Sequence, residues 1–285
     1  YLAFVDSDDY LKKDTLNKAV AFFDRNYDVV DLVAFPSRTF KNGKESSPHY
    51  RYRVLITSGV YDVSNTTYAY AHITRLEAVY KNRGAGKNIH FDENLGFQED
   101  LKYNIETVLE KQAIGYSNHG CYCYEQQDGG IQSTTLYAYN IFETSMALWE
   151  SEFAKYEGAV PVYLQSLYLC DIAWKLNANK LFPYHYEGEE FQKAIDRIDA
   201  LLARVDSDIL VDHPTMDSFR KTYFYARGHK GELIFATNGN TLSLNVNNST
   251  LYSRTKVEIV VLKSMIRDGI FKIRGYLKSP CFSVC

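Results

Sequence analysis

The sequence predicts an α/β domain, then a helical module, then an antiparallel β module. Three observations support this order. An apolar segment followed by an amphipathic helix opens the chain, apolar residues recur at helical spacing from residue 141, and the spacing changes to an alternation of two near residue 230. We expect the boundaries at residues 1–140, 141–228 and 229–285. The last module is incomplete at Cys285 if it is one sheet of a sandwich.

The chain begins with a short apolar segment that runs directly into carboxylates. Phe4 and Val5 precede Asp6, Asp8 and Asp9. If this segment is a buried strand, the carboxylates stand at its carboxyl end, where open α/β sheets bind ligands. Aspartates spaced one residue apart can hold a hard divalent cation together with a phosphate-bearing ligand. The alternative is a helix N-cap, because aspartate is favoured at helix starts and an amphipathic helix follows.

A second acidic pair stands further along the chain. Residues 91–98 have the composition of a loop, Glu99 and Asp100 follow them, and residues 101–109 have the pattern of a helix. The alternative is again a helix start, because acidic side chains complement the macrodipole there.

In their order and spacing, the segments Phe4–Asp9 and Phe91–Asp100 resemble the family 2 glycosyltransferases with the GT-A fold. The resemblance covers roughly residues 1–140. It implies a partial, Rossmann-like GT-A domain that lacks its N-terminal nucleotide-binding portion before Phe4. Weaker similarity at Pro161–Gln165 and Asp171–Trp174 is to glycosyltransferases of teichoic-acid or capsule synthesis.

The resemblance also implies roles for the acidic residues. Asp6 and Asp8 would hold Mg²⁺ or Mn²⁺, and Asp9 would join them in binding a nucleotide-sugar donor. Asp100 would be the catalytic base, and Glu99 would orient it or bind acceptor hydroxyls. The implied reaction is an inverting transfer to a carbohydrate or lipid-linked glycan acceptor of a cell-surface polysaccharide or wall polymer. The alternative is a non-catalytic glycan-binding or assembly module built on a GT-A remnant.

The tyrosines Tyr122 and Tyr124, followed by Ser133, resemble the strand that often comes next in this family. Many relatives carry basic residues after these tyrosines. This chain has Glu125 and Gln126 there, which argues against a phosphate contact from that position.

Several elements follow from local signals. Asp14 and Thr15 can cap a helix whose apolar residues extend to Tyr27, and residues 32–35 read as a buried strand. From residue 141, three segments have apolar residues at helical spacing and are predicted to be helices. Their aromatic and aliphatic side chains, Trp174 among them, are expected in the core. A fourth helix is expected to open at His213.

The C-terminal region has turn signals between alternating segments. We expect four antiparallel strands with one buried face: residues 232–237, a second around 242–246, a third around 257–261 and a fourth at 271–274. Asn238 with Gly239 and Asp268 with Gly269 predict the two turns. This module either packs against the helices without a further role or takes part in carbohydrate binding or assembly.

Composition narrows the classes of function. The net charge of −3 gives no electrostatic case for nucleic acid. The five cysteines are scattered without zinc-ligand spacing, which favours reduced thiols in a cytosolic protein. No apolar run is long enough to span a bilayer, and no signal-like segment precedes the first strand. The expected location is therefore the cytoplasm, with peripheral association at the inner face of the plasma membrane as an option.

Overall fold

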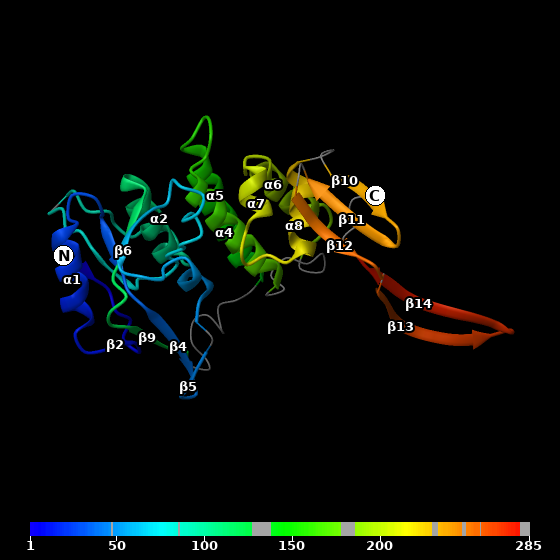
Figure 1. Ribbon diagram of the computed structural model, residues 1–285, viewed down its shortest axis with the longest axis horizontal. Coiled ribbons are helices and arrows are strands. Elements are labelled where there is room, and N and C mark those ends of the chain that lie inside the picture. The colour runs from blue at the N-terminus through cyan, green and yellow to red at the C-terminus, as the bar shows by residue number, and fades with distance from the viewer. Residues whose placement is uncertain are drawn as a thin grey trace. The chain divides into compact units, whose positions relative to one another are not determined.

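The computed structural model describes residues 1–46, 48–84, 86–126, 138–177, 186–229, 233–246, 249–256 and 258–279. The chain divides into two compact units, Tyr1–Lys193 and Ala194–Cys285. The first unit contains mixed α/β sheets and long helices, and the second contains helices and antiparallel strands (Figure 1). The predicted fold class is confirmed, while the predicted three-part boundaries stay a prediction.

A five-stranded sheet forms the centre of the first unit. Its strands lie in the order β1 (Leu2–Ala3), β7 (Ala78–Tyr80), β3 (Leu32–Ala34), β8 (Ala113–Tyr116) and β6 (Gly59–Asp62). The pair β3 and β8 is parallel and the other pairs are antiparallel. The buried residues of β3, β7 and β8 make this sheet the core of the unit.

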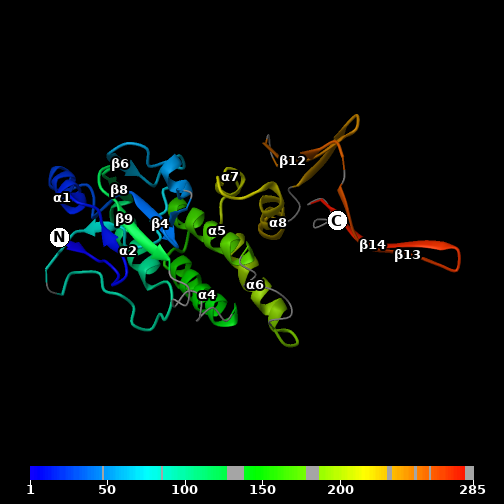
Figure 2. The ribbon, with the colours of Figure 1, turned by 90° about the horizontal axis from the view of Figure 1, so that it is seen from below.

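Helices cover both faces of this sheet, because successive side chains of a strand point to opposite sides. Val33 of β3 and its partner Val79 of β7 pack in one cluster with Phe23 of α1 (Thr15–Arg25). The next residue of β7, Tyr80, turns to the other side and contacts Tyr103 of α2 (Glu99–Lys111). The sheet is thus the middle layer between α1 and α2 (Figures 1 and 2).

A second, four-stranded sheet lies beside the first acidic segment. Its order is β2 (Tyr10–Leu11), β9 (Tyr122–Gln126), β4 (Ser37–Lys41) and β5 (Lys44–Glu45). Asn42 and Gly43 both have positive φ in the turn between β4 and β5, which suits a tight hairpin. Because β2 pairs with β9, the acidic residues that precede β2 lie next to Tyr122 and Tyr124.

Two expectations for the start of the chain were wrong. The first strand is an edge strand that pairs with β7 alone, and it is not buried; Val5 after it is 45% exposed. Asp14 precedes α1 in the left-handed region and makes no side-chain cap hydrogen bond. The Thr15 hydroxyl instead donates to the carbonyl of Lys12 at 2.7 Å, so a local turn takes the place of the expected cap.

Two long helices complete the first unit: α4 (Ala138–Ala154) and α5 (Val162–Asn177). Their aromatic residues Trp149, Phe153 and Tyr168 pack against one another in the core. Trp174 is an exception to the expected burial, because it is 43% exposed and lies against the ammonium group of Lys175.

The second unit begins within α6 (Glu190–Leu202) and continues with α7 (Ser207–Val211) and α8 (Ser218–Gly228). The helix expected at His213 is wrong in position, because His213 lies in the turn after α7. The last helix starts at Ser218, where the Asp217 carboxylate accepts a hydrogen bond from the Arg220 N–H at 2.9 Å. An N-cap of this kind satisfies a free donor of the first turn.

The C-terminal strands form two separate groups, a three-stranded sheet and a hairpin. They are β10 (Ile234–Asn238), β11 (Thr241–Val246), β12 (Ser249–Arg254), β13 (Glu258–Arg267) and β14 (Ile270–Lys278). Both predicted turns are present, with positive φ at Gly239, Asp268 and Gly269. The strand β12 was not predicted. The predicted first residues of two strands, Glu232 and Val257, lie outside the described residues.

The expected buried face is present in β11 and β12, where Leu244, Val246, Leu251 and Tyr252 are buried. Within the described residues, β13 and β14 bury neither face. Their register gives one side that bears no charge and another that is cationic. The uncharged side carries Ile259, Val261, Ile266, Phe271, Ile273 and Leu277. The cationic side carries Lys263, Arg267, Lys272, Arg274 and Lys278, of which Lys278 pairs with Glu258 on the same side.

One buried ion pair anchors the loops beside the central sheet. Arg51, from the short 3₁₀ helix Tyr50–Arg53, pairs with Glu77 immediately before β7, and both side chains are almost fully buried. A second guanidinium nitrogen of Arg51 donates to the Tyr52 hydroxyl at 2.9 Å. The pair therefore fixes the loop that leads into β7.

Replacing Glu77 by Gln should destabilise the fold strongly, because it leaves the Arg51 charge buried without a counter-ion. We expect the free energy of unfolding in urea to fall by about 3–5 kcal/mol. The matched control is Glu45→Gln, which breaks the partly exposed pair with Arg38 and should cost less than about 1 kcal/mol. Equal losses in the two variants would contradict the prediction.

Candidate active site

An aromatic cluster joins the two acidic segments. Phe4 lies two residues before Asp6, and its ring centroid is 5.6 Å from Tyr103 of α2 and 5.1 Å from Phe91. Phe91 and Tyr103 stack at 4.9 Å, and Tyr80 of β7 contacts both Phe4 and Tyr103. Such ring pairs contribute beyond their buried area. The cluster therefore holds the chain start, β7, the loop at residue 91 and α2 together.

The negative charges of the two acidic segments affect the pKa of Asp6. Partial burial raises the pKa of Asp6, and the negative charges of Asp9, Asp8 and Glu99 raise it further. Glu99 is the first residue of α2, and its effect on Asp6 agrees with the ring contacts of Phe4 with Phe91 and Tyr103, which hold the start of α2 near the first acidic segment. The two predicted motifs thus meet in one region of the first unit.

Asp9 has a defined structural setting within this region. One of its carboxylate oxygens accepts a hydrogen bond from the Tyr122 hydroxyl at 2.6 Å, and the other accepts one from the Glu125 N–H at 3.0 Å. The Tyr122 hydroxyl also accepts a hydrogen bond from the Asp6 N–H at 3.3 Å. Asp9 therefore ties the acidic loop to β9, while the side chains of Asp6 and Asp8 remain exposed to solvent.

Asp100 lies in the first turn of α2 and is the more buried residue of its pair. Burial raises its pKa from 3.8 to about 7, and the neighbouring charge of Glu99 acts in the same direction. The Leu101 N–H, which donates to Asp100 at 2.6 Å, and the charge of Arg75 lower this pKa but do not cancel the effect of burial. A carboxylate with a pKa near 7 is well suited to accept a proton at neutral pH.

A hydrogen-bond network behind Asp100 was not predicted from the sequence. Gln98, which precedes α2 with a positive φ of 68°, donates to Asp171 of α5 at 2.9 Å and accepts from Ser145 of α4 at 2.5 Å. Asp171 also accepts from Trp149 at 2.6 Å and pairs with the buried Lys175. The network fixes the start of α2 against α4 and α5. The spacing of Asp171 and Lys175, four residues apart on one helix, suggests their ion pair, but nothing in the sequence links either residue to Gln98.

The sequence predicts Asp6, Asp8, Asp9, Glu99 and Asp100 as site residues. The structure brings the two segments that contain them into one region of the first unit. Ser133 lies outside the described residues. Among the residues that the structure describes, no group of three or more His, Cys, Asp or Glu side chains is arranged to hold a metal ion. Within the same residues, no helix is long and apolar enough to cross a membrane.

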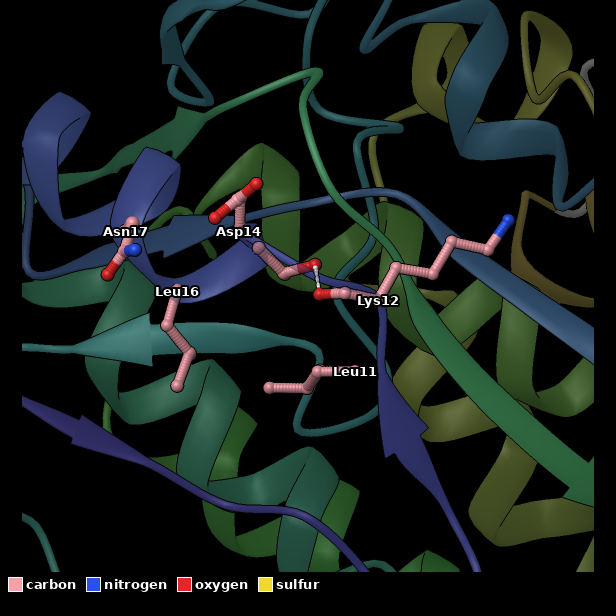
Figure 3. A pocket seen from close by; sticks show the side chains of 6 residues that line it. Leu11, Lys12, Asp14, Leu16 and Asn17 are labelled. Carbon is pink, nitrogen blue, oxygen red and sulfur yellow. Dashed lines mark hydrogen bonds between the residues drawn. The ribbon is translucent and has the colours of Figure 1, made fainter.

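A small pocket at the start of α1 contains none of these carboxylates. It is lined by Leu11, Lys12, Asp14, Thr15, Leu16 and Asn17. In Figure 3 the side chains of Leu11 and Leu16 lie together, and that of Lys12 points away from them. The pocket therefore gives no reason to move the candidate site away from the acidic region.

Comparison with known proteins finds no matching family model. Over 226 residues the chain is 25% identical to the minor teichoic acid biosynthesis protein GgaB of Bacillus subtilis, covering 77% of this chain and 25% of that protein. Over 145 residues it is 28% identical to the poly(ribitol-phosphate) beta-N-acetylglucosaminyltransferase TarS of Staphylococcus aureus, covering 48% of this chain and 23% of that protein. The chain is related to the teichoic-acid-type glycosyltransferases.

The chain spans about a quarter of the length of these two curated relatives. Among solved structures, a fragment of S. aureus TarS in complex with UDP-GlcNAc matches with a TM-score of 0.55 at 17% identity. That match covers 87% of this chain and 73% of the TarS chain. It supports the same fold, and with the sequence relatives it confirms the predicted resemblance.

Tyr103 should contribute strongly to the stability of the first unit, because its ring contacts three other rings. We expect Tyr103→Ala to lower the free energy of unfolding by about 3–5 kcal/mol, as for other buried aromatic truncations. Tyr103→Phe keeps the ring and should cost less than about 1.5 kcal/mol. Urea unfolding of both variants checks this, and a small loss in Tyr103→Ala would show that the cluster does not join the two segments.

The raised pKa of Asp100 makes stability depend on pH. The folded state favours the protonated carboxyl, so its stabilising contribution is present below about pH 4 and is lost as pH rises to about 7. Asp100→Asn cannot ionise and keeps this contribution. We expect the free energy of unfolding of Asp100→Asn relative to the wild type to increase between pH 4 and pH 7 and then to stay constant. Parallel pH profiles of the two proteins would mean that Asp100 is not buried as described.

Proposed function

We propose that the chain is part of a glycosyltransferase that transfers a sugar from a nucleotide-sugar donor to a hydroxyl of a wall-polymer acceptor. The relatives support the class of reaction, and TarS binds UDP-GlcNAc in its structure. The observation that carries the proposal is the 5.6 Å ring contact between Phe4, two residues before Asp6, and Tyr103 of α2. It holds the two acidic segments together, and donor and acceptor chemistry must share one site.

In the proposed reaction Asp100 acts as the general base. Its carboxylate takes the proton of an acceptor hydroxyl, whose oxygen then attacks the anomeric carbon of the donor sugar. The bond from that carbon to the diphosphate oxygen breaks, and the nucleoside diphosphate leaves with the electron pair. One base with no covalent nucleophile gives a single displacement, so the configuration at the anomeric carbon inverts. Glu99 would orient the base or bind acceptor hydroxyls.

The first acidic segment fits a divalent cation by its donor chemistry. Asp6 and Asp8 are largely exposed carboxylates; partial burial raises the pKa of Asp6, and the nearby negative charges raise it further. Mg²⁺ and Mn²⁺ prefer oxygen ligands, and Mg²⁺ is commonly held by one or two carboxylates with substrate phosphates. These two residues would hold the ion, which would supply Lewis-acid neutralisation of the leaving diphosphate. Asp9 would orient the loop through its hydrogen bonds to β9.

Two substitutions should separate the base from the donor site. With UDP-GlcNAc and poly(ribitol-phosphate), Asp100→Asn should lower kcat by about 10²- to 10⁴-fold and leave the Kd for UDP with Mn²⁺ unchanged. Asp8→Asn should weaken UDP binding in Mn²⁺ and reduce its dependence on the ion, because it removes a ligand charge. UDP release and calorimetric titration measure the two effects.

The matched control is Asp14→Asn, which removes an exposed charge outside the acidic segment, immediately before α1, and should change neither quantity. Near-normal turnover in Asp100→Asn would contradict the assignment of the base, and unchanged metal dependence in Asp8→Asn would contradict that of the metal ligand. Binding of the polymer with no transfer in any variant would favour the alternative, a non-catalytic glycan-binding or assembly module. A location in the cytoplasm or at the inner membrane face stays a prediction.

A further inference from the structure

Arg75 is a cation near both acidic segments. It lies in the loop just before β7, and its guanidinium carbon is 4.2 Å from the ring centroid of Tyr124 on β9. One guanidinium nitrogen donates to the Thr39 hydroxyl of β4 at a long 3.4 Å. The Arg75 carbonyl accepts a hydrogen bond from Asn104 of α2 at 3.0 Å. The residue is thus attached both to the second sheet and to the helix that carries Asp100.

The charge of Arg75 acts on groups of the candidate site. Burial raises the pKa of Asp100, and Arg75 is one of the groups that lower it. The pKa of Tyr124 is raised mainly by burial, lowered by Arg75, and raised again by Asp9, Asp8 and Asp6. Tyr124 therefore lies within reach of both the Arg75 cation and the first acidic segment.

Three of the six arginines of the first unit are held by ion pairs, and Arg75 is not one of them. Arg38, Arg51 and Arg83 each pair with a carboxylate. Across the described ranges, no carboxylate oxygen lies within ion-pair distance of Arg75. A guanidinium that stacks on an aromatic ring keeps its N–H donors at its edge, in a plane that suits two phosphoryl oxygens at once.

A cation at this place would favour a phosphate-bearing ligand in addition to the divalent ion proposed above. The region holds several carboxylates, and β9 contributes Glu125 and Gln126 rather than basic residues. These carboxylates repel a phosphoryl group, and the guanidinium of Arg75 would offset part of the repulsion that remains beside the divalent ion.

We propose that Arg75 is a phosphoryl-binding residue of this site, with its free N–H groups donating to phosphoryl oxygens. Two sources supply this chemistry: the diphosphate of a nucleotide-sugar donor, and a phosphate of a phosphate-containing acceptor. The inference builds on the proposed function, but it concerns binding alone and does not require that transfer take place in the chain by itself.

The test is calorimetric titration of the whole chain with three probes in Mn²⁺: UDP, ribitol 5-phosphate and uridine. Arg75→Gln should weaken binding of UDP or of ribitol 5-phosphate by about 10- to 100-fold, the loss expected for a hydrogen bond to a charged group. Uridine has no phosphate, so its affinity should not change. Which phosphate compound responds identifies the donor or the acceptor as the ligand.

Two further variants exclude a general loss of structure. Arg75→Lys keeps the charge and should restore binding in part, while Arg38→Gln removes a guanidinium that already pairs with Glu45 and should change nothing. Circular dichroism and the thermal midpoint confirm that each variant is folded. Equal affinities of the wild type and Arg75→Gln for both phosphate compounds would overturn the inference, and so would the absence of binding to either protein.

The proposed function and this inference fail in different ways. Transfer by the wild type with phosphate binding unchanged in Arg75→Gln would overturn the role of Arg75 and leave the glycosyltransferase. UDP binding that depends on Arg75, without transfer by the wild type to any acceptor, would support phosphoryl binding by Arg75. The same result would contradict the proposed glycosyltransferase activity.

Discussion

The contact between Phe4 and Tyr103 is the constraint on which the candidate site depends. Phe4 precedes the first acidic segment, and Tyr103 belongs to the helix that begins with Glu99 and Asp100. Tyr80 and Phe91 complete the cluster from β7 and from the loop before α2. These ring contacts hold together two segments that are far apart in the sequence, and so bring their carboxylates into one region of the first unit.

The second constraint is electrostatic. Bringing Asp6, Asp8, Asp9 and Glu99 together costs free energy through repulsion. The pKa of Asp6 is raised mainly by partial burial, and the repulsion from these neighbours raises it further. The structure offsets part of this cost with hydrogen bonds from Tyr122 and Glu125 to Asp9. It leaves Asp6 and Asp8 exposed, which is what a site that receives a cation and a phosphate-bearing ligand requires.

Much of the fold could be predicted from local patterns. The turns at Asn238–Gly239 and Asp268–Gly269 followed from residues that tolerate positive φ, and the helices followed from apolar spacing. The cap at Asp14 and the helix start at His213 were wrong, because a residue type that favours a cap does not determine which turn the chain takes. The exposed position of Trp174 was not predicted. Helical spacing identifies the apolar face of a helix, but it does not show how far around the helix the burial extends.

The candidate site could be predicted only as a set of residues. The acidic pattern identified Asp6, Asp8 and Asp100, whereas their approach depends on aromatic contacts between distant segments. The network of Gln98, Asp171 and Lys175 could not be predicted for the same reason, since its members come from separate helices and their neighbours. Arg75 belongs to no motif that the sequence analysis identified, and only its position over the ring of Tyr124 indicates a role in the site.

The most direct test of this account is a crystal structure of the chain with Mn²⁺ and UDP, with the ion located by anomalous scattering. We expect the ion beside the carboxylates of Asp6 and Asp8, and the Asp100 carboxylate in the same cleft within about 10 Å of it, as shared donor and acceptor chemistry requires. An ion bound elsewhere, or Asp100 on a different face of the first unit, would contradict the claim that the two acidic segments form one site.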